Sequence, residues 1–228
     1  MKATDEGIFL HRTAFSSSSL IVTYYTRQYG LRKFVFKGGK KKAHQLFPLS
    51  ISELTYYGRP ESDLLQLTSC DASVHTDFQF EPIKSTIAFF IAEAIRKSVH
   101  EFDVDQNMFN FLRQAVIDLD QREKDLGLFP IVFLVEFAEM LGMQPLVEGS
   151  ARFFDLDEGT ISDSAHPGHR SSSGEHVQII VDAIHGGSLS ASKATRENAL
   201  QTLMEYYTIH IPRLKQFETF AIVKEILS

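Results

Sequence analysis

The sequence contains little of several residue types that characterise other classes of protein. Its 228 residues include one cysteine, Cys70, and no tryptophan. A single cysteine excludes an internal disulfide and a zinc site built from several thiolates, which suits a reducing compartment. No apolar stretch approaches the roughly 18 uninterrupted residues that a membrane helix needs. The opening residues, MKATDEGIFL, carry acids where a signal peptide has a basic and then an apolar segment, so we expect a cytoplasmic protein.

Motifs for phosphate binding or nucleophilic catalysis are also missing. Gly38-Gly39-Lys40 lacks the spacing and the following helix of a phosphate-binding loop, and no Gly-x-Ser-x-Gly sequence occurs. No activating pattern surrounds Cys70, so we expect a packed thiol. These absences predict that the protein is not an enzyme.

A group of histidines and acids near residue 170 is the one candidate for a metal site. His166 and His169 are three residues apart, close to Asp163, His176 and His185. Imidazoles and carboxylates are zinc ligands, so a metal hydrolase is one alternative function. The segment is rich in glycine and serine and has no rigid element to fix a tetrahedral site. We therefore expect solvated histidines, no metal and no cofactor.

The charge is distributed unevenly along the chain. The net charge is −6, and 43% of the residues are apolar, which is enough for a substantial core. Residues 1–80 contain ten Lys and Arg against seven Asp and Glu, whereas residues 81–228 contain thirteen against twenty-two. A basic first third and an acidic remainder suggest two domains with different tasks.

The densest positive charge lies between residues 20 and 42, where two apolar runs flank a turn at Gly30. Seven Lys and Arg fall within residues 27–42, interleaved with aromatic rings and with no acid between them. Cations beside rings are typical of surfaces that hold phosphates and unpaired bases, although a β-hairpin with a solvated lysine turn is an alternative. We expect these residues to contact DNA: Tyr24, Arg27, Arg32, Lys33, Phe34, Lys37, Lys40, Lys41 and Lys42. In a small barrel half of the rings must face inward, so several of these aromatics belong to the core.

Short strands separated by turn residues dominate the first third of the chain. Apolar and β-branched runs occur at 7–12, 20–26, 31–37, 49–57 and 64–68. Five strands in about 70 residues indicate a small barrel, and the OB-fold is the commonest such arrangement. We therefore assign residues 1–80 to an OB-fold nucleic-acid-binding domain.

From about Pro82 the spacing of apolar residues changes to three and four, which predicts helices. The expected helices cover 83–95, 108–119 with Asp105 as N-cap, 130–141, 177–184 and two further stretches separated by Pro212. Ser172-Ser173-Gly174-Glu175 fits a capping box. Residues 149–174 show no periodicity and are expected to be irregular. The predicted fold class is α+β multidomain: a five-stranded OB-fold barrel followed by an all-α helical domain at 81–228 with an irregular insertion at about 149–174.

The stretch GIFLHRTAFSSSSLIVTYYTRQYGLRKFVFKGGKKKA resembles the opening of RecO, a family of bacterial recombination mediators. Thr26, Gly30, Lys37 and Gly38 occupy matching places, and Phe47-Pro48 matches the step into the fourth strand. The segment 137–143 is similar to the family's central helix, and YYTIHIPRLKQFETFAIVKEIL is similar to its last helical segment. The order and spacing of these motifs are more specific than any one of them.

The resemblance implies an N-terminal OB-fold, a C-terminal helical domain and a function without catalytic turnover. It implies a protein at the nucleoid that binds single- and double-stranded DNA, anneals complementary strands, and works with RecR to let RecA replace single-strand-binding protein (SSB) in recombinational DNA repair. It also implies that the helical domain binds the acidic and apolar C-terminal tail of SSB. Many members carry a four-cysteine zinc ribbon, which this chain lacks, so zinc is not carried over.

The sequence allows alternatives for the position of the tail-binding site and for the kind of nucleic acid that is bound. The predicted central helix contains Glu136 and Glu139 and no base, so the charge that meets an acidic tail must come from neighbouring helices. The candidates are Arg96, Lys97 and Arg113. An OB-fold factor that binds RNA or tRNA is the alternative to a DNA mediator, because the same basic hairpin would serve both.

Overall fold

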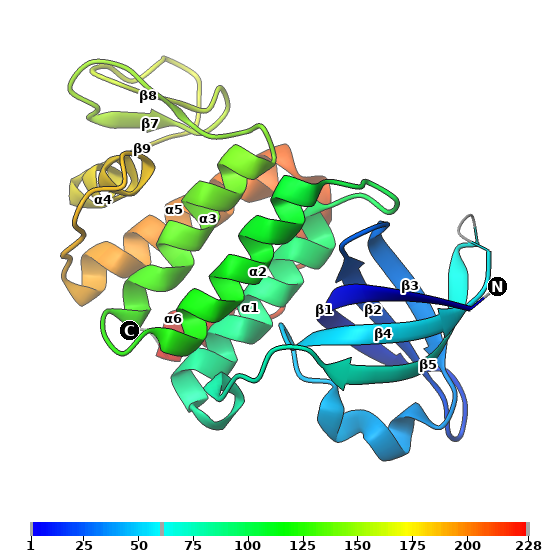
Figure 1. Ribbon diagram of the computed structural model, residues 1–228. Coiled ribbons are helices and arrows are strands. Elements are labelled where there is room, and N and C mark those ends of the chain that lie inside the picture. Colours follow the sequence, from blue (N-terminus) through cyan, green and yellow to red (C-terminus); the bar gives the residue numbers. More distant parts are fainter. Residues whose placement is uncertain (1, 60–61, 227–228) are drawn as a thin grey trace. The chain divides into compact units, whose positions relative to one another are not determined.

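The first five strands form a closed barrel in the computed structural model, which describes residues 2–59 and 62–226. The strands are β1 (Lys2–Ala14), β2 (Leu20–Thr26), β3 (Gly30–Phe36), β4 (Ile51–Tyr57) and β5 (Leu64–Ala72). Their order around the barrel is β1-β2-β3-β5-β4 (Figure 1), and all neighbours are antiparallel except β3 and β5. This arrangement confirms the predicted barrel.

β1 is the longest strand of the barrel, and its two halves pair largely with different neighbours. It pairs with β2 through residues 7–14 and with β4 through residues 2–8. The register with β2 shifts between Phe9 and His11, which is a β-bulge of the kind that bends a strand around a barrel. Gly7 lies where both pairings meet, and a Cβ there would come within 2.7 Å of the Leu54 side chain.

Two helices follow the barrel, α1 (Pro82–Ser98) and α2 (Gln106–Gln121). α2 is capped by Asp105, whose Oδ1 accepts the amide protons of Asn107 and Met108 at 2.7 and 3.1 Å. The Asp120 carboxylate near its other end accepts the amide protons of Asp77 and Phe78, so α2 fixes the segment between β5 and α1. The contacts of the chain group both helices with the barrel in one compact unit, residues 1–121.

The second compact unit, residues 122–228, is built on α3 (Phe129–Met140), α4 (Glu175–Ile184), α5 (Lys193–His210) and α6 (Phe220–Ile226). α3 is the apolar helix expected from the sequence. Phe133 and Phe137 stack at 5.3 Å, and Phe137 stacks in turn on Tyr207 of α5. The Tyr207 hydroxyl donates to the carbonyl of Leu134 at 2.6 Å, which satisfies a fully buried polar group. The structure thus confirms the predicted fold class of a barrel followed by helices.

Residues 149–174 differ from the expectation of an irregular excursion. They hold β7 (Phe153–Asp155), β8 (Thr160–Ser162) and β9 (Ser171–Ser173), which are labelled in Figure 1. With β6 (Leu146–Val147) they form a sheet of order β6-β8-β7-β9. Strands of two or three residues are too short for an alternating pattern to appear in the sequence. Phe154, one of the apolar residues in this segment, is fully buried against Tyr206 of α5.

The predicted capping box at the start of α4 is wrong. The N-cap position is Gly174, with no side-chain hydrogen bond, and the Ser172 hydroxyl contacts the His176 ring and Thr202 instead. The predicted domain boundary at residue 80 stays a prediction. The contacts within the chain define a different division, into compact units that meet after Gln121. No helix within the described ranges is long and apolar enough to cross a bilayer.

Candidate nucleic-acid interface

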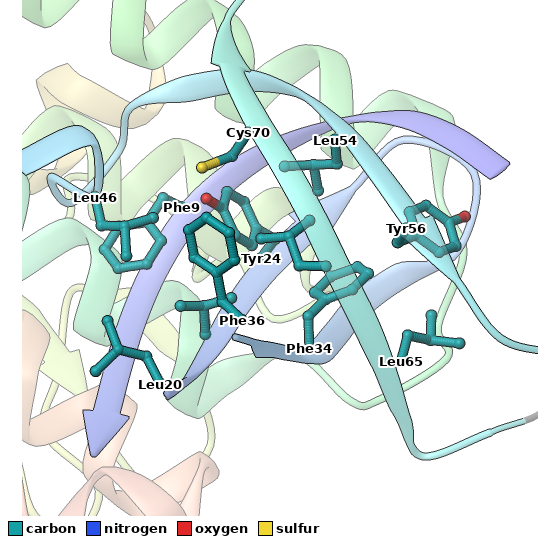
Figure 2. Packing of buried hydrophobic residues seen from close by; sticks show 12 residues of the cluster. Phe9, Leu20, Tyr24, Phe34, Phe36, Leu46, Leu54, Tyr56, Leu65 and Cys70 are labelled. Atoms are coloured by element: carbon teal, nitrogen blue, oxygen red, sulfur yellow. The ribbon is translucent and has the colours of Figure 1, made fainter. Parts of the chain in front are cut away.

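Tyr24 and Phe34, two rings expected to stack on bases, lie inside the barrel. Tyr24 is fully buried and Phe34 is 1% exposed. Their rings meet edge to face at 6.0 Å, and Phe9 and Tyr56 extend the same cluster (Figure 2). Both residues belong to the barrel core, so the prediction that they contact DNA is corrected.

The core also includes Cys70, the single cysteine. Its thiol lies beside the Tyr24 hydroxyl (Figure 2), and burial raises the pKa of Cys70 above its usual range. The thiol is therefore protonated and unreactive near neutral pH. This agrees with the packed thiol expected from the sequence.

Arg32, a third predicted contact, is also unavailable for direct contact with a phosphate. It is 3% exposed, and its Nη2 donates to the carbonyl of Ser62 at 2.8 Å. Its guanidinium lies 4.5 Å from the ring centroid of Phe102. Arg32 thus ties β3 to two loops of the same unit.

Arg27 and Lys33 lie at the surface but already have acidic partners. Arg27 donates to Glu6 at 2.7 Å, and its guanidinium lies 4.4 Å from the ring centroid of Phe109 on α2. Lys33 forms an ion pair with Glu101. Both side chains are partly exposed, so a phosphate would have to compete with these carboxylates.

The remaining predicted cations, Lys37, Lys40, Lys41 and Lys42, are all exposed. Within the described part of the chain none of these four lysines forms an ion pair. Three of them lie on a 3-10 helix, η1 (Gly39–Gln45), which begins after Gly38 in the left-handed region at φ 70°. In Figure 1 this helix is the light-blue coil beside the barrel.

Hydrogen bonds hold η1 to the neighbouring strands. The amide of Lys40 donates to the carbonyl of Ser18 in the β1–β2 turn at 3.3 Å. Arg12 of β1 donates from Nη1 to the carbonyl of Ala43 at 2.5 Å and is itself exposed. We call these five residues the lysine surface: Arg12, Lys37, Lys40, Lys41 and Lys42. Sequence reasoning missed Arg12, because only the hydrogen bond across 31 residues reveals its place.

The three residues proposed to meet an acidic tail do not form one site. Lys97 pairs with Glu93 at 2.6 Å, and both side chains are largely buried. Arg113 on α2 lies 3.6 Å from Glu6 of β1, on the same carboxylate that holds Arg27. Arg96, in the last turn of α1, is half-buried.

Side chains of the histidine segment, residues 163–176, form pairwise hydrogen bonds. His169 Nδ1 lies 2.7 Å from Asp155 Oδ2, and Asp163 accepts the amide proton of Ser150 at 2.7 Å. The hydrogen bond to Asp155 raises the pKa of His169. Among the residues that the structure describes, no three His, Cys, Asp or Glu side chains are grouped to hold a metal ion.

The geometry therefore offers an exposed cluster of cations that hydrogen bonds from Arg12 and from the Lys40 amide attach to the barrel. Such a cluster binds a polyanion by displacing its counterions, and it does not distinguish one base sequence from another. The rings that would add base stacking are not those predicted on β2 and β3, since both of those are core.

Comparison with known proteins gives one family over nearly the whole chain. Residues 1–74 match the family model described as Recombination protein O N terminal, and residues 79–216 match Recombination protein O C terminal. A protein named DNA repair protein RecO from Bacteroides fragilis is 25% identical over 96% of this chain and 97% of its own. The protein of the same name from Flavobacterium johnsoniae is 27% identical over the full length of both chains.

Proposed function

The chain belongs to the Recombination protein O family, and from this premise we propose that it is a non-catalytic, DNA-binding mediator of recombinational repair. In this proposal it binds single- and double-stranded DNA, anneals complementary strands and helps load the recombinase RecA onto DNA coated with SSB. RecR and the C-terminal tail of SSB are its proposed protein partners. Such work takes place at the nucleoid, in the cytoplasm.

The lysine surface is the observation that carries the proposal. Lys37, Lys40, Lys41 and Lys42 form no ion pair with any acid that the structure describes, whereas Arg27 and Lys33 are already paired. Each cation that meets a phosphate releases a condensed counterion, which favours binding at moderate salt whatever the sequence. A mediator that handles any stretch of DNA needs this kind of contact, because it cannot depend on reading bases.

The proposed binding of an acidic, apolar tail is best supported on α1. Arg96 has the exposed ring of Phe89 two turns away, so both residues lie on the same face of the helix. Phe89 is 47% exposed and could anchor an apolar residue of the tail while Arg96 meets an acid. Lys97 and Arg113 contribute less, because each is held by a glutamate.

The test of DNA binding is the salt dependence of affinity for a single-stranded oligonucleotide. Replacing Lys40, Lys41 and Lys42 with alanine should lower the slope of log K against log salt by roughly 2, since each phosphate contact on a single strand contributes about 0.7. The matched control replaces three exposed lysines of the second unit, Lys124, Lys193 and Lys215, which removes the same charge. An unchanged slope in the first variant, or an equal fall in both, would contradict the proposal.

Annealing of complementary strands coated with SSB tests the mediator role itself. The parent protein should accelerate annealing, and the Lys40, Lys41 and Lys42 variant should not. The affinity is also compared between RNA and DNA oligonucleotides of the same sequence. A strong preference for RNA would point to contacts with the 2′-hydroxyl and to an RNA-binding factor instead.

A further inference from the structure

A cavity of about 480 Å³ lies between the barrel and the segment that leads from β5 to α1. Its walls come from the end of η1, the start of β4, the end of β5 and residues 74–80, all within the first compact unit. This volume falls within the range of small-molecule sites in proteins, roughly 300–1,000 Å³. It is not the face of β2 and β3 on which the sequence placed DNA.

The cavity begins where the lysine surface ends. His44 and Gln45, the last two residues of η1, form part of its wall, and Lys40, Lys41 and Lys42 precede them on the same short helix. The lysines and one wall of the cavity are therefore carried by a single short element. The distance along η1 is short, because a 3-10 helix rises about 2 Å per residue.

One wall carries an aromatic ring that the fold leaves in solvent. Phe80 lines the cavity and is 78% exposed, more than any other large apolar side chain in the described ranges. Phe47 also lines it and is held in place by Phe78 and Phe89, with ring centroids 5.9 and 5.5 Å away. An exposed ring costs solubility, and beside a cationic surface it offers a platform for a base.

Polar groups complete the walls. Asp71, Thr76 and Gln79 line the cavity and supply a carboxylate, a hydroxyl and an amide. A carboxylate accepts hydrogen bonds from the amino groups of cytosine, adenine or guanine, and an amide or hydroxyl can donate as well as accept. A ring face together with hydrogen-bond donors and acceptors suits a heterocyclic base.

We propose that this cavity holds one unstacked base of a single strand whose phosphates lie on the lysine surface. The inference rests on the proposed DNA binding and adds a site to it. A base is favoured over an acidic peptide because Asp71 would repel carboxylates in the cavity, and no Lys or Arg lines it. The phosphates stay outside, on η1, where the positive charge is.

The site predicts that affinity for single strands depends on Phe80 only when bases are present. Phe80→Ala should weaken binding of a short single-stranded oligonucleotide by about tenfold, the effect of losing one base–ring stack. The same substitution should leave the affinity unchanged for a strand of equal length in which every nucleotide is abasic. The control is Tyr57→Ala, which removes an exposed ring from β4 outside the cavity and should affect neither strand.

Fluorescence anisotropy of the parent and the two variants with both strands, at one salt concentration, gives the six affinities needed. Loss of the same factor on both strands, or on neither, would overturn the proposal. Because Phe80 is mostly in solvent, the variant should keep the melting temperature of the parent, and this is measured alongside. A free nucleoside monophosphate should not displace the strand at the same base concentration, and displacement would assign the cavity to a free nucleotide instead.

The outcomes separate this inference from the function on which it rests. If the lysine variant keeps its salt slope, the proposed DNA interface fails. If the slope falls as expected while Phe80→Ala binds both strands like the parent, the interface stands and only the base site fails.

Discussion

Asp5 on β1 shows how one residue can oppose the stability of the barrel. It is 4% exposed, and its Oδ2 accepts the amide proton of Gln28 at 3.1 Å, while Oδ1 has no hydrogen-bond partner among the residues that the structure describes. Burial is the largest influence on the pKa of Asp5 and raises it above 3.8, although hydrogen bonds and Arg27 oppose the shift. The folded state therefore holds this proton more tightly than the unfolded chain does.

We predict that Asp5→Asn stabilises the protein at neutral pH. Stability linked to a carboxyl with a raised folded-state pKa is complete below pH 3.8 and falls as the pH rises through the folded-state value. Asparagine keeps the shape and never ionises, so the variant should melt at a higher temperature than the parent at pH 7. Near pH 3, where Asp5 is protonated in both states, the difference should vanish. Glu53→Gln, an exposed neighbour on β4, should change little, and a lower melting temperature for Asp5→Asn at pH 7 would show that the ionised form is favoured.

The pair of His169 and Asp155 should stabilise the second unit within a limited range of pH. The hydrogen bond between them raises the pKa of His169 above 6.5. Burial raises the pKa of Asp155, but hydrogen bonds from His169 and from two backbone amides outweigh it, so that the value lies below 3.8. The histidine contribution is complete below pH 6.5 and is lost as the pH rises through the folded-state value. The aspartate contribution is complete above pH 3.8 and is lost as the pH falls.

His169→Ala should accordingly lower the melting temperature more at pH 5 than at pH 8.5. Thermal unfolding followed by circular dichroism at the two pH values measures the difference. His185→Ala, an exposed histidine at the end of α4, is the matched control and should show no such dependence. A loss for His169→Ala that is equal at both pH values would mean that the pair contributes packing and no charge interaction.

Among the elements, the β2–β3 turn is constrained by tertiary packing as well as by its own backbone. Gly30 has φ 62°, and a Cβ added there would come within 2.1 Å of the carbonyl oxygen of Asp103. Gly38 at the start of η1 has φ 70°, and a Cβ there meets nothing within 4 Å. The two glycines share a left-handed conformation and differ only in the neighbouring backbone.

This difference predicts unequal effects of the same substitution. Gly38→Ala should cost about 1 kcal/mol of unfolding free energy, the strain of a left-handed alanine. Gly30→Ala should cost about 3 kcal/mol or more, because a backbone carbonyl cannot rotate away as a side chain can. Urea unfolding of both variants gives the comparison. Equal losses would show that the loop at Asp103 moves freely and does not constrain the turn.

The strands and helices were largely predictable from the sequence, whereas the side of each strand that is accessible was not. Side chains alternate between the two faces of β2. This alternation correctly predicts that Tyr24 faces the barrel interior, and it puts Tyr25 on the outer face. Tyr25 is nevertheless 2% exposed, because its ring stacks on Phe109 of α2 at 6.4 Å. A helix that covers the outer face of a strand leaves no local pattern in that strand. For the same reason the sequence could identify the lysines of η1, which follow one another, but could not identify Phe80 or Arg12.

At the scale of the whole molecule, the charge is divided between the two compact units in a way that bears on DNA binding. Residues 1–121 contain fourteen Lys and Arg and fourteen Asp and Glu, so their net charge is zero. Residues 122–228 contain nine against fifteen and carry the whole net charge of −6. The lysine surface and the cavity both belong to the neutral unit. The acidic unit can only weaken the attraction of a polyanion.

The fragment 1–121 should therefore fold alone and bind a single strand at least as tightly as the full chain at low salt. Removing a net charge of −6 should lower the Kd, and the advantage should disappear at about 1 M salt, where the screening length is about 3 Å. The fragment 1–80 is the informative comparison. It lacks Phe109, which stacks on Tyr25, and Asp120, which holds the backbone of Asp77 and Phe78, so it should unfold without cooperativity. Melting curves and anisotropy titrations of the two fragments and the full chain test this order. A fragment 1–121 that folds but binds only weakly at every salt concentration would place an essential DNA contact in residues 122–228.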